Sequence, residues 1–278
     1  MSFLVLLVIL WVEKFSAFRR VIQRDGFYLG ELARLESAGS TRGHPWVMLF
    51  ILVALPALLL AMLLWVVQPV AYGLLALPVH FLILTWSLGR GDLKAALGPL
   101  RDAWRRGDDQ AALHVAERDV GLSAEGPGEL VEAVQGWLLW QALQSFFSVV
   151  FWYCVLGPAA ALAYRLVALA CEHSRNPLLA ERAGRVRHVL DWLPVRLLAL
   201  SFALVGNFVA VCRLMLHELL SGSVSAASLA ARCGRLAADL PGHPSSAQGV
   251  AGLDSLWSLL QRAAILWYAL IALWTLLY

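Results

Sequence analysis

Three short stretches of the sequence hold side chains whose types and spacing could bind a ligand. Each places an arginine near an acid or an aromatic ring, and a guanidinium presents several N–H donors that suit carboxylates and phosphates. We therefore predict that they bind an anionic ligand or a lipid headgroup. The candidate residues are Arg118 and Asp119 in AERDVGL, Trp152, Tyr164 and Arg165 in FWYCVLGPAAALAYR, and Asp191, Trp192 and Arg196 in HVLDWLPVRL.

The first two stretches also have purely structural explanations. Arg118 and Asp119 are more typical of a solvated helix end with mixed charges than of a ligand site. Arg165 follows a long uncharged run, so its charge either faces protein within the membrane or extends to the membrane surface. Both alternatives stay open at the level of sequence.

The third stretch has the composition of a helix start. Asp191 is a good helix N-cap, and Pro194 is tolerated in a first turn because no backbone N–H partner is lost there. Trp192 then serves as an interfacial anchor. Arg196 is mildly unfavourable near the positive end of a helix, so we expect an anionic group beside it: Asp191 itself, an acid of the 89–132 segment, a lipid phosphate or a ligand.

Signatures of catalysis are missing from the sequence. It contains no GxxxxGK[ST], GxSxG or HExxH motif, and its seven histidines include no pair spaced for a shared metal. The four cysteines form no CxxC pair and are expected to act as small apolar residues. We predict no catalytic residue, no metal and no cofactor.

The elements that carry these residues are predicted from composition. Hydrophobic residues make up 60% of the 278 residues, only 15% are charged, and the mean hydropathy is +0.70. Trp46–Leu88 and Ala133–Tyr164 contain no charged residue, and a membrane-spanning helix needs roughly 20 apolar residues. No strand pattern occurs. We predict an all-α, polytopic integral membrane protein with about 4–6 membrane helices and a helical cytoplasmic segment.

The chain divides into six segments by this interpretation. They are an N-terminal apolar helix and basic segment over 1–45, a transmembrane hairpin over 46–88, a cytoplasmic helical segment over 89–133, the core membrane helices over 134–216, a polar or loop segment over 217–261, and a C-terminal transmembrane helix over 262–278.

The distribution of Lys and Arg predicts which side of the membrane the loops occupy. Segments 13–44 and 89–132 are rich in both residues, which places them in the cytoplasm and the Val66–Pro69 turn outside. A loop over 173–187 carries four arginines and also favours the cytoplasm. Around Gly157–Pro158 the sequence allows either one kinked span or a packed helical pair. The net charge of +3, without a basic tail, argues against nucleic acid.

The order of these stretches resembles the AmpE/CobD(CbiB) membrane protein family, over about residues 85–210, and is most similar to its AmpE branch. The resemblance implies a multi-pass protein of the bacterial inner (cytoplasmic) membrane that modulates β-lactamase induction and peptidoglycan recycling. It also implies membrane lipids and a cell-wall-derived or other anionic small ligand as partners. It leaves the oligomeric state open.

The alternative implied by the same resemblance is a membrane-bound enzyme related to the ATP-dependent adenosylcobinamide-phosphate synthase. Scaffold residues such as Trp152, Tyr164 and Pro194 are kept, whereas Arg187 and His188 stand where the synthases have paired acids. A ligase that holds Mg²⁺ against phosphates needs carboxylates. The comparison therefore favours a non-catalytic role over the enzyme.

Overall fold

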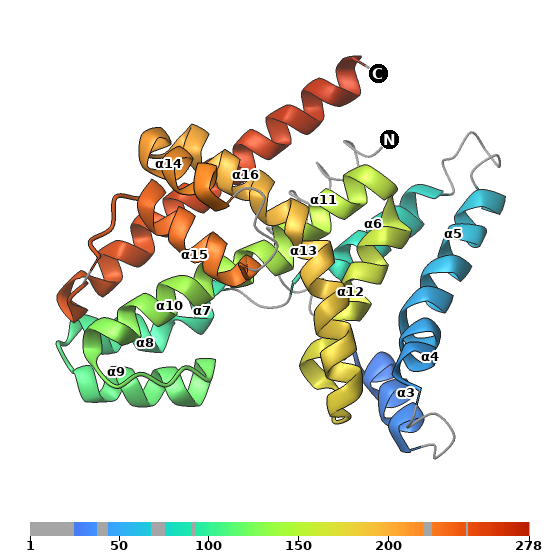
Figure 1. Ribbon diagram of the computed structural model, residues 1–278, viewed down its shortest axis with the longest axis horizontal. Helices are drawn as coiled ribbons and strands as arrows, with labels where there is room; N and C mark the ends of the chain where they lie inside the picture. Colours follow the sequence, from blue (N-terminus) through green and yellow to red (C-terminus); the bar gives the residue numbers. More distant parts are fainter. Residues whose placement is uncertain are drawn as a thin grey trace. The chain divides into compact units, whose positions relative to one another are not determined.

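The structure, a computed structural model, is helical throughout the residues it describes and has no strand among them. This confirms the predicted all-α class. The chain forms two compact units, which we call the first and the second unit and describe separately (Figure 1). The first unit comprises Met1–Gly89, Ser148–Asp191 and Ile271–Tyr278, and the second comprises Arg90–Phe147 and Trp192–Leu270. The described residues are 25–37, 44–67, 76–89, 93–218, 224–242 and 244–277.

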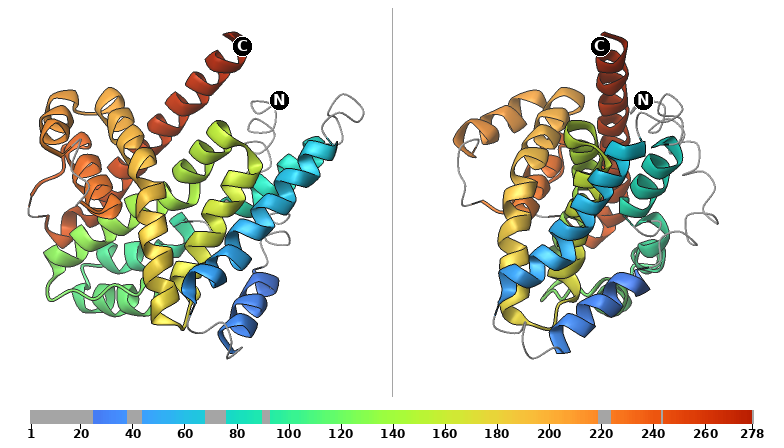
Figure 2. Two further views of the ribbon diagram at one scale, coloured as in Figure 1. Left: turned by 45° about the vertical axis from the view of Figure 1, so that its right-hand side comes forward. Right: turned by 90° about the vertical axis from the view of Figure 1, so that its right-hand side faces the viewer.

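The first unit is centred on helix α12, which packs against α5, α6 and α11 (Figure 2). Its core joins Leu166 and Leu169 of α12 to Met48 and Leu52. Because α12 is apolar on several faces, helices surround it. The elements are α3 (Gly26–Ser37), α4 (Pro45–Leu49), the π-helical turn η1 (Phe50–Ala54), α5 (Leu55–Val67), α6 (Ala76–Ser87), α11 (Ser148–Leu156), α12 (Pro158–His173), the part of α13 (Pro177–Val205) up to Asp191, and the end of α16.

A tight turn at Gly157 decides between the two arrangements that the sequence allowed for this block. Gly157 has a φ of +84°, a conformation that glycine adopts without strain, and Pro158 then begins α12. Helices α11 and α12 pack directly against each other. The block is therefore a packed helical pair.

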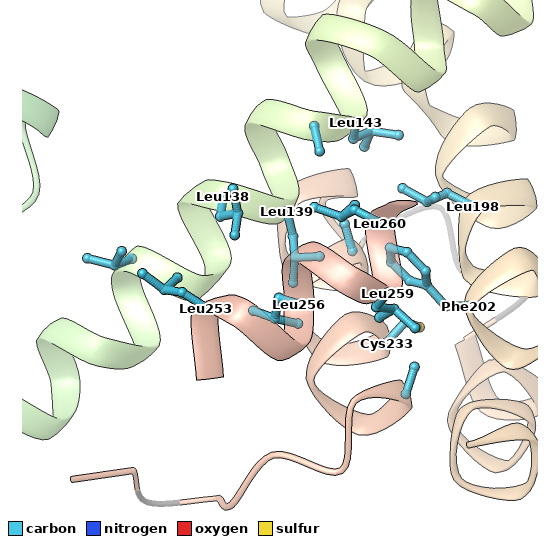
Figure 3. Packing of buried hydrophobic residues seen from close by; sticks show 14 of the residues in the cluster. Leu138, Leu139, Leu143, Leu198, Phe202, Cys233, Leu253, Leu256, Leu259 and Leu260 are labelled. Atoms are coloured by element: carbon cyan, nitrogen blue, oxygen red, sulfur yellow. The ribbon is translucent and has the colours of Figure 1, made fainter. Parts of the chain in front are cut away.

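The second unit is built around α10, which packs against α15. Gly234 of α15 allows this close approach, because a Cβ there would lie 2.7 Å from a methyl carbon of Leu139. Leu139, Phe202 and Leu256 meet in the core (Figure 3). The elements are α7 (Leu93–Ala96), α8 (Gly98–Arg105), α9 (Asp109–Val115), the π-helical turns η3 (Ala116–Val120) and η4 (Leu143–Phe147), α10 (Pro127–Ala142), the rest of α13, α14 (Phe208–Glu218), α15 (Ala226–Ala237), η5 (Ser246–Gln248) and α16 (Gly249–Leu277).

Four helices among the described residues are long and apolar enough to cross a membrane, and α6 is a shorter apolar helix. This agrees with the predicted polytopic helical membrane protein. The first arm of the predicted hairpin is found as one continuous helix over Pro45–Val67. The predicted helix over 2–23 lies outside the described residues, as do the last two residues of the Val66–Pro69 turn. The four helices are Pro45–Val67, Pro127–Leu156, Pro177–Val205 and Ser246–Leu277.

The predicted helix start at Asp191 is wrong. Helix α13 begins at Pro177, so only residues 174–176 of the predicted 173–187 loop connect it to α12. Residues 177–190 contain three Leu, three Arg, two Ala and one Glu, all of them good helix formers. Asp191 lies in mid-helix, and Pro194 interrupts the helix interior without ending it.

Candidate functional site

Asp191 is the centre of a group of buried polar side chains in the first unit. It is 1% exposed, and its Oδ1 accepts hydrogen bonds from the Tyr164 hydroxyl at 2.7 Å and the Ser148 hydroxyl at 3.2 Å. Arg187, one turn earlier on α13, places its Nε 3.6 Å from Oδ2. The carboxylate is therefore held by side chains from α11, α12 and α13.

Two further ion pairs extend this group. The Nη1 of Arg187 lies 3.4 Å from Oε1 of Glu172, and the Nη2 of Arg165 lies 3.8 Å from Oδ2 of Asp25. Both arginines are buried, and each faces a carboxylate of the same unit. Arg165 thus faces protein, as one of the two sequence alternatives required. We call the set the ionic cluster: Asp25, Ser148, Tyr164, Arg165, Glu172, Arg187 and Asp191.

Trp152 has a backbone partner that explains how Pro194 is accommodated. Proline has no N–H, so the carbonyl of Leu190, four residues before it, receives no bond from within the helix. The indole Nε1 of Trp152 donates to that carbonyl at 3.2 Å. A side chain from α11 therefore replaces the missing donor of α13.

Trp192 and Arg196 form a stacked pair in the second unit. The guanidinium carbon of Arg196 lies 3.9 Å from the ring centroid of Trp192, and its Nη1 donates to the Trp192 carbonyl at 2.9 Å. Its Nη2 donates to the carbonyl of Glu218, the last residue of α14, at 3.5 Å. The electron-rich ring and the negative end of α14 lie beside Arg196, but neither is a charged group, so the anionic partner expected from the sequence stays a prediction.

Arg118 and Asp119 bond to each other on the surface of the second unit. Arg118 Nε and Nη2 donate to Asp119 Oδ1 and Oδ2 at 2.7 and 2.9 Å. This two-pronged bond raises the pKa of Arg118 and lowers the pKa of Asp119. An anionic ligand at Arg118 would have to compete with the carboxylate beside it.

The structure thus separates the predicted residues into different places. Tyr164, Asp191 and Trp152 meet around α13 in the first unit, with Arg165 in the same ionic cluster. The sequence interpretation missed four members of the cluster. Arg187 had a recognisable signal, the i,i+4 spacing from Asp191 on one helix, whereas the other three are distant in sequence. The missed members are Asp25, Ser148, Glu172 and Arg187.

In the described ranges, no group of three or more His, Cys, Asp and Glu side chains is placed to hold a metal ion.

Helices of membrane-crossing length, with charged side chains buried between them, define a polytopic helical membrane protein. The model of a family described as "Regulatory signalling modulator protein AmpE" matches residues 1–217. The chain belongs to this AmpE family. The "Protein AmpE" of Shigella flexneri is 27% identical over 158 residues, which are 52% of this chain and 56% of that protein.

The chain therefore spans little more than half the length of this relative in the matched region. No solved structure matches the chain. The similarity to the CobD/CbiB branch stays a prediction from sequence.

Proposed function

We propose that this chain is a non-catalytic regulatory signalling modulator of the bacterial inner membrane that acts on β-lactamase induction and peptidoglycan recycling. The observation that carries the proposal is the family match over residues 1–217. The helices of membrane-crossing length support the location. The relative is named AmpE without a stated reaction, and a regulatory role requires none.

The ionic cluster is the part of the molecule best suited to hold a signalling state. Ionisable side chains among membrane helices are costly and mark functional positions. Separating a buried carboxylate from its partners costs several kcal/mol, typically about 3–5 when one partner is lost. A change in the packing of α12 against α13 would have to break or exchange the bonds of Asp191. The cluster therefore favours a few discrete packing arrangements of α12 and α13 over a gradual sliding of one helix along the other.

The ligand in this proposal is an anionic small molecule derived from the cell wall, or a lipid headgroup, at the cytoplasmic face. The contacts predicted from sequence divide between the units: Trp152, Tyr164, Arg165 and Asp191 belong to the first, and Arg118, Asp119, Trp192 and Arg196 to the second. The Trp192 ring stacks on the guanidinium of Arg196, and 37% of the surface of Trp192 is exposed to a ligand. Arg196 and Trp192 are therefore the first contacts to test.

A deletion strain of the native bacterium tests the regulatory role. We expect deletion to change the β-lactamase activity reached after exposure to an inducing β-lactam, and the wild-type gene to restore it. Asp191→Asn should fail to restore it, because the neutral amide cannot pair with Arg187. Arg185→Ala should restore it, since the pair that Arg185 forms with Glu181 lies on the exposed side of α13.

Each arm of this experiment has a contradicting outcome. Unchanged induction in the deletion strain would exclude the regulatory role. Full restoration by Asp191→Asn, at equal protein level in the membrane, would exclude the cluster. An Arg165→Ala/Arg196→Ala double variant that behaves as wild type would exclude the ligand contacts. Growth of a strain lacking adenosylcobinamide-phosphate synthase, when supplied with this gene, would contradict a non-catalytic protein.

A further inference from the structure

Arg182 differs from the other arginines at the start of α13 in having no carboxylate partner among the residues that the structure describes. Arg185 bonds to Glu181 at 2.6 Å, and Arg187 bonds to Glu172 and Asp191. In the part of the chain that the structure describes, Arg182 makes no hydrogen bond or ion pair, and its Nε is enclosed without an acceptor. The other two nitrogens of the guanidinium, Nη1 and Nη2, are not enclosed, so an oxygen from outside the described residues can bond to them.

The guanidinium is held in place by an aromatic ring. The guanidinium carbon of Arg182 lies 5.8 Å from the ring centroid of Trp46, within the range of a cation–π contact. Trp46 is 56% exposed, so the ring covers one side of the guanidinium and leaves the pair accessible. A planar guanidinium held in this way presents its N–H groups in a fixed fork, which fits two oxygens of one phosphate.

The same contact gives the depth of Arg182 relative to the membrane. Trp46 is at the beginning of a helix of 23 residues, Pro45–Val67. Such a helix is about 35 Å long, close to the roughly 30 Å of a hydrocarbon core. Trp46 therefore lies at one membrane–water boundary, where indole rings are enriched. Arg182, in contact with it, lies at the depth of the lipid phosphates.

We propose that Arg182 and Trp46 form a binding site for the phosphate of an anionic phospholipid. Arg182 is one of four arginines in 173–187, and their positive charge favours the cytoplasmic leaflet, whose surface is negative. The site includes none of the eight residues predicted from sequence. It does not depend on the regulatory role, because lipid binding is measured without β-lactamase.

Native mass spectrometry of the full chain in neutral detergent tests the proposal, with phosphatidylglycerol as the probe and phosphatidylethanolamine as the zwitterionic comparison. We expect the wild type to retain phosphatidylglycerol preferentially. Arg182→Ala should weaken its retention roughly tenfold or more, the usual effect of losing a charge-assisted hydrogen bond. Arg185→Ala is the matched control, because it removes the same charge from the same helix at an exposed pair. It should retain phosphatidylglycerol as wild type does.

Two further variants separate binding from folding. Arg182→Lys keeps the positive charge but loses the forked pair of N–H donors. Trp46→Leu keeps an apolar side chain but loses the aromatic ring. Both variants should bind phosphatidylglycerol more weakly than wild type while keeping wild-type helicity. Wild-type binding by Arg182→Ala, or equal losses in Arg182→Ala and Arg185→Ala, would overturn the proposal. Displacement of phosphatidylglycerol by inorganic phosphate would also overturn it, in favour of a soluble anion.

Discussion

At the scale of single residues, the clearest interaction is the bond from Trp152 to the carbonyl of Leu190. That carbonyl lacks a helical donor only because Pro194 stands four residues later. Trp152 and Pro194 are thus coupled through one acceptor atom, although neither needs to touch the other. Proline in a helix interior is usually disruptive, and here the indole offsets part of its effect.

This coupling predicts a non-additive pair of substitutions. Trp152→Phe should lower the free energy of unfolding by about 1 kcal/mol, because the Leu190 carbonyl loses its donor inside the protein. In a Pro194→Ala background the new backbone N–H satisfies that carbonyl, so Trp152→Phe should have a much smaller effect. Denaturant titration of the four proteins in detergent measures both values. Equal losses in the two backgrounds would show that the bond contributes nothing.

At the scale of elements, the joint between α13 and α14 depends on a close backbone approach. A Cβ at Gly206 would lie 2.5 Å from the carbonyl oxygen of Ala237, at the end of α15. The next residue, Asn207, donates its N–H to that same oxygen at 3.1 Å, and its side chain bonds to Asp239. The carbonyl of Ala237 therefore ties the end of α15 to the start of α14.

Gly206→Ala should therefore destabilise the protein by about 1–3 kcal/mol, since the clash is with backbone that cannot rotate away. Gly136→Ala is the matched control in the same unit. Its Cβ would lie 3.6 Å from Ala231, an ordinary contact, and alanine favours a helix interior. Thermal unfolding in detergent should show a lower midpoint for Gly206→Ala alone. A midpoint that is lowered equally by both substitutions would contradict this account of the joint.

The elements also show what sequence could and could not predict. The span over Pro45–Val67 follows from an apolar run, because contact with lipid depends on local composition. The partners of Asp191 lie 27 and 43 positions away, at Tyr164 and Ser148. The local sequence pattern does not indicate which faces of α11, α12 and α13 pack together. Local sequence therefore indicates only the strongest local preference of Asp191, which is helix capping, and the bonds to Tyr164 and Ser148 override it.

At the scale of the whole molecule, the arrangement of helices in the first unit predicts on which side of the membrane its turns lie. Helices α11 and α12 are joined by the turn at Gly157, so Leu156 and Arg175 lie at opposite ends of α12. Trp46 and Arg182 lie at the end near Arg175, and the arginines of 173–187 predict that this end is cytoplasmic. Leu156, which is 66% exposed, should then face the other side.

Cysteine labelling of intact cells checks this topology. In a background without the four native cysteines, a membrane-impermeant maleimide should label Leu156→Cys in intact cells. It should label Arg175→Cys only after the cells are opened. Labelling of Arg175→Cys in intact cells would invert the topology and would place the lipid site in the outer leaflet.

The π-helical turn η4 stands immediately before Ser148. A π-helical turn holds one more residue than an α-helical path requires, and each residue turns a helix by about 100°. Removing one residue from Leu143–Phe147 would therefore rotate the Ser148 hydroxyl away from Asp191. Among homologous chains, a one-residue gap at these positions should coincide with a different residue at 191.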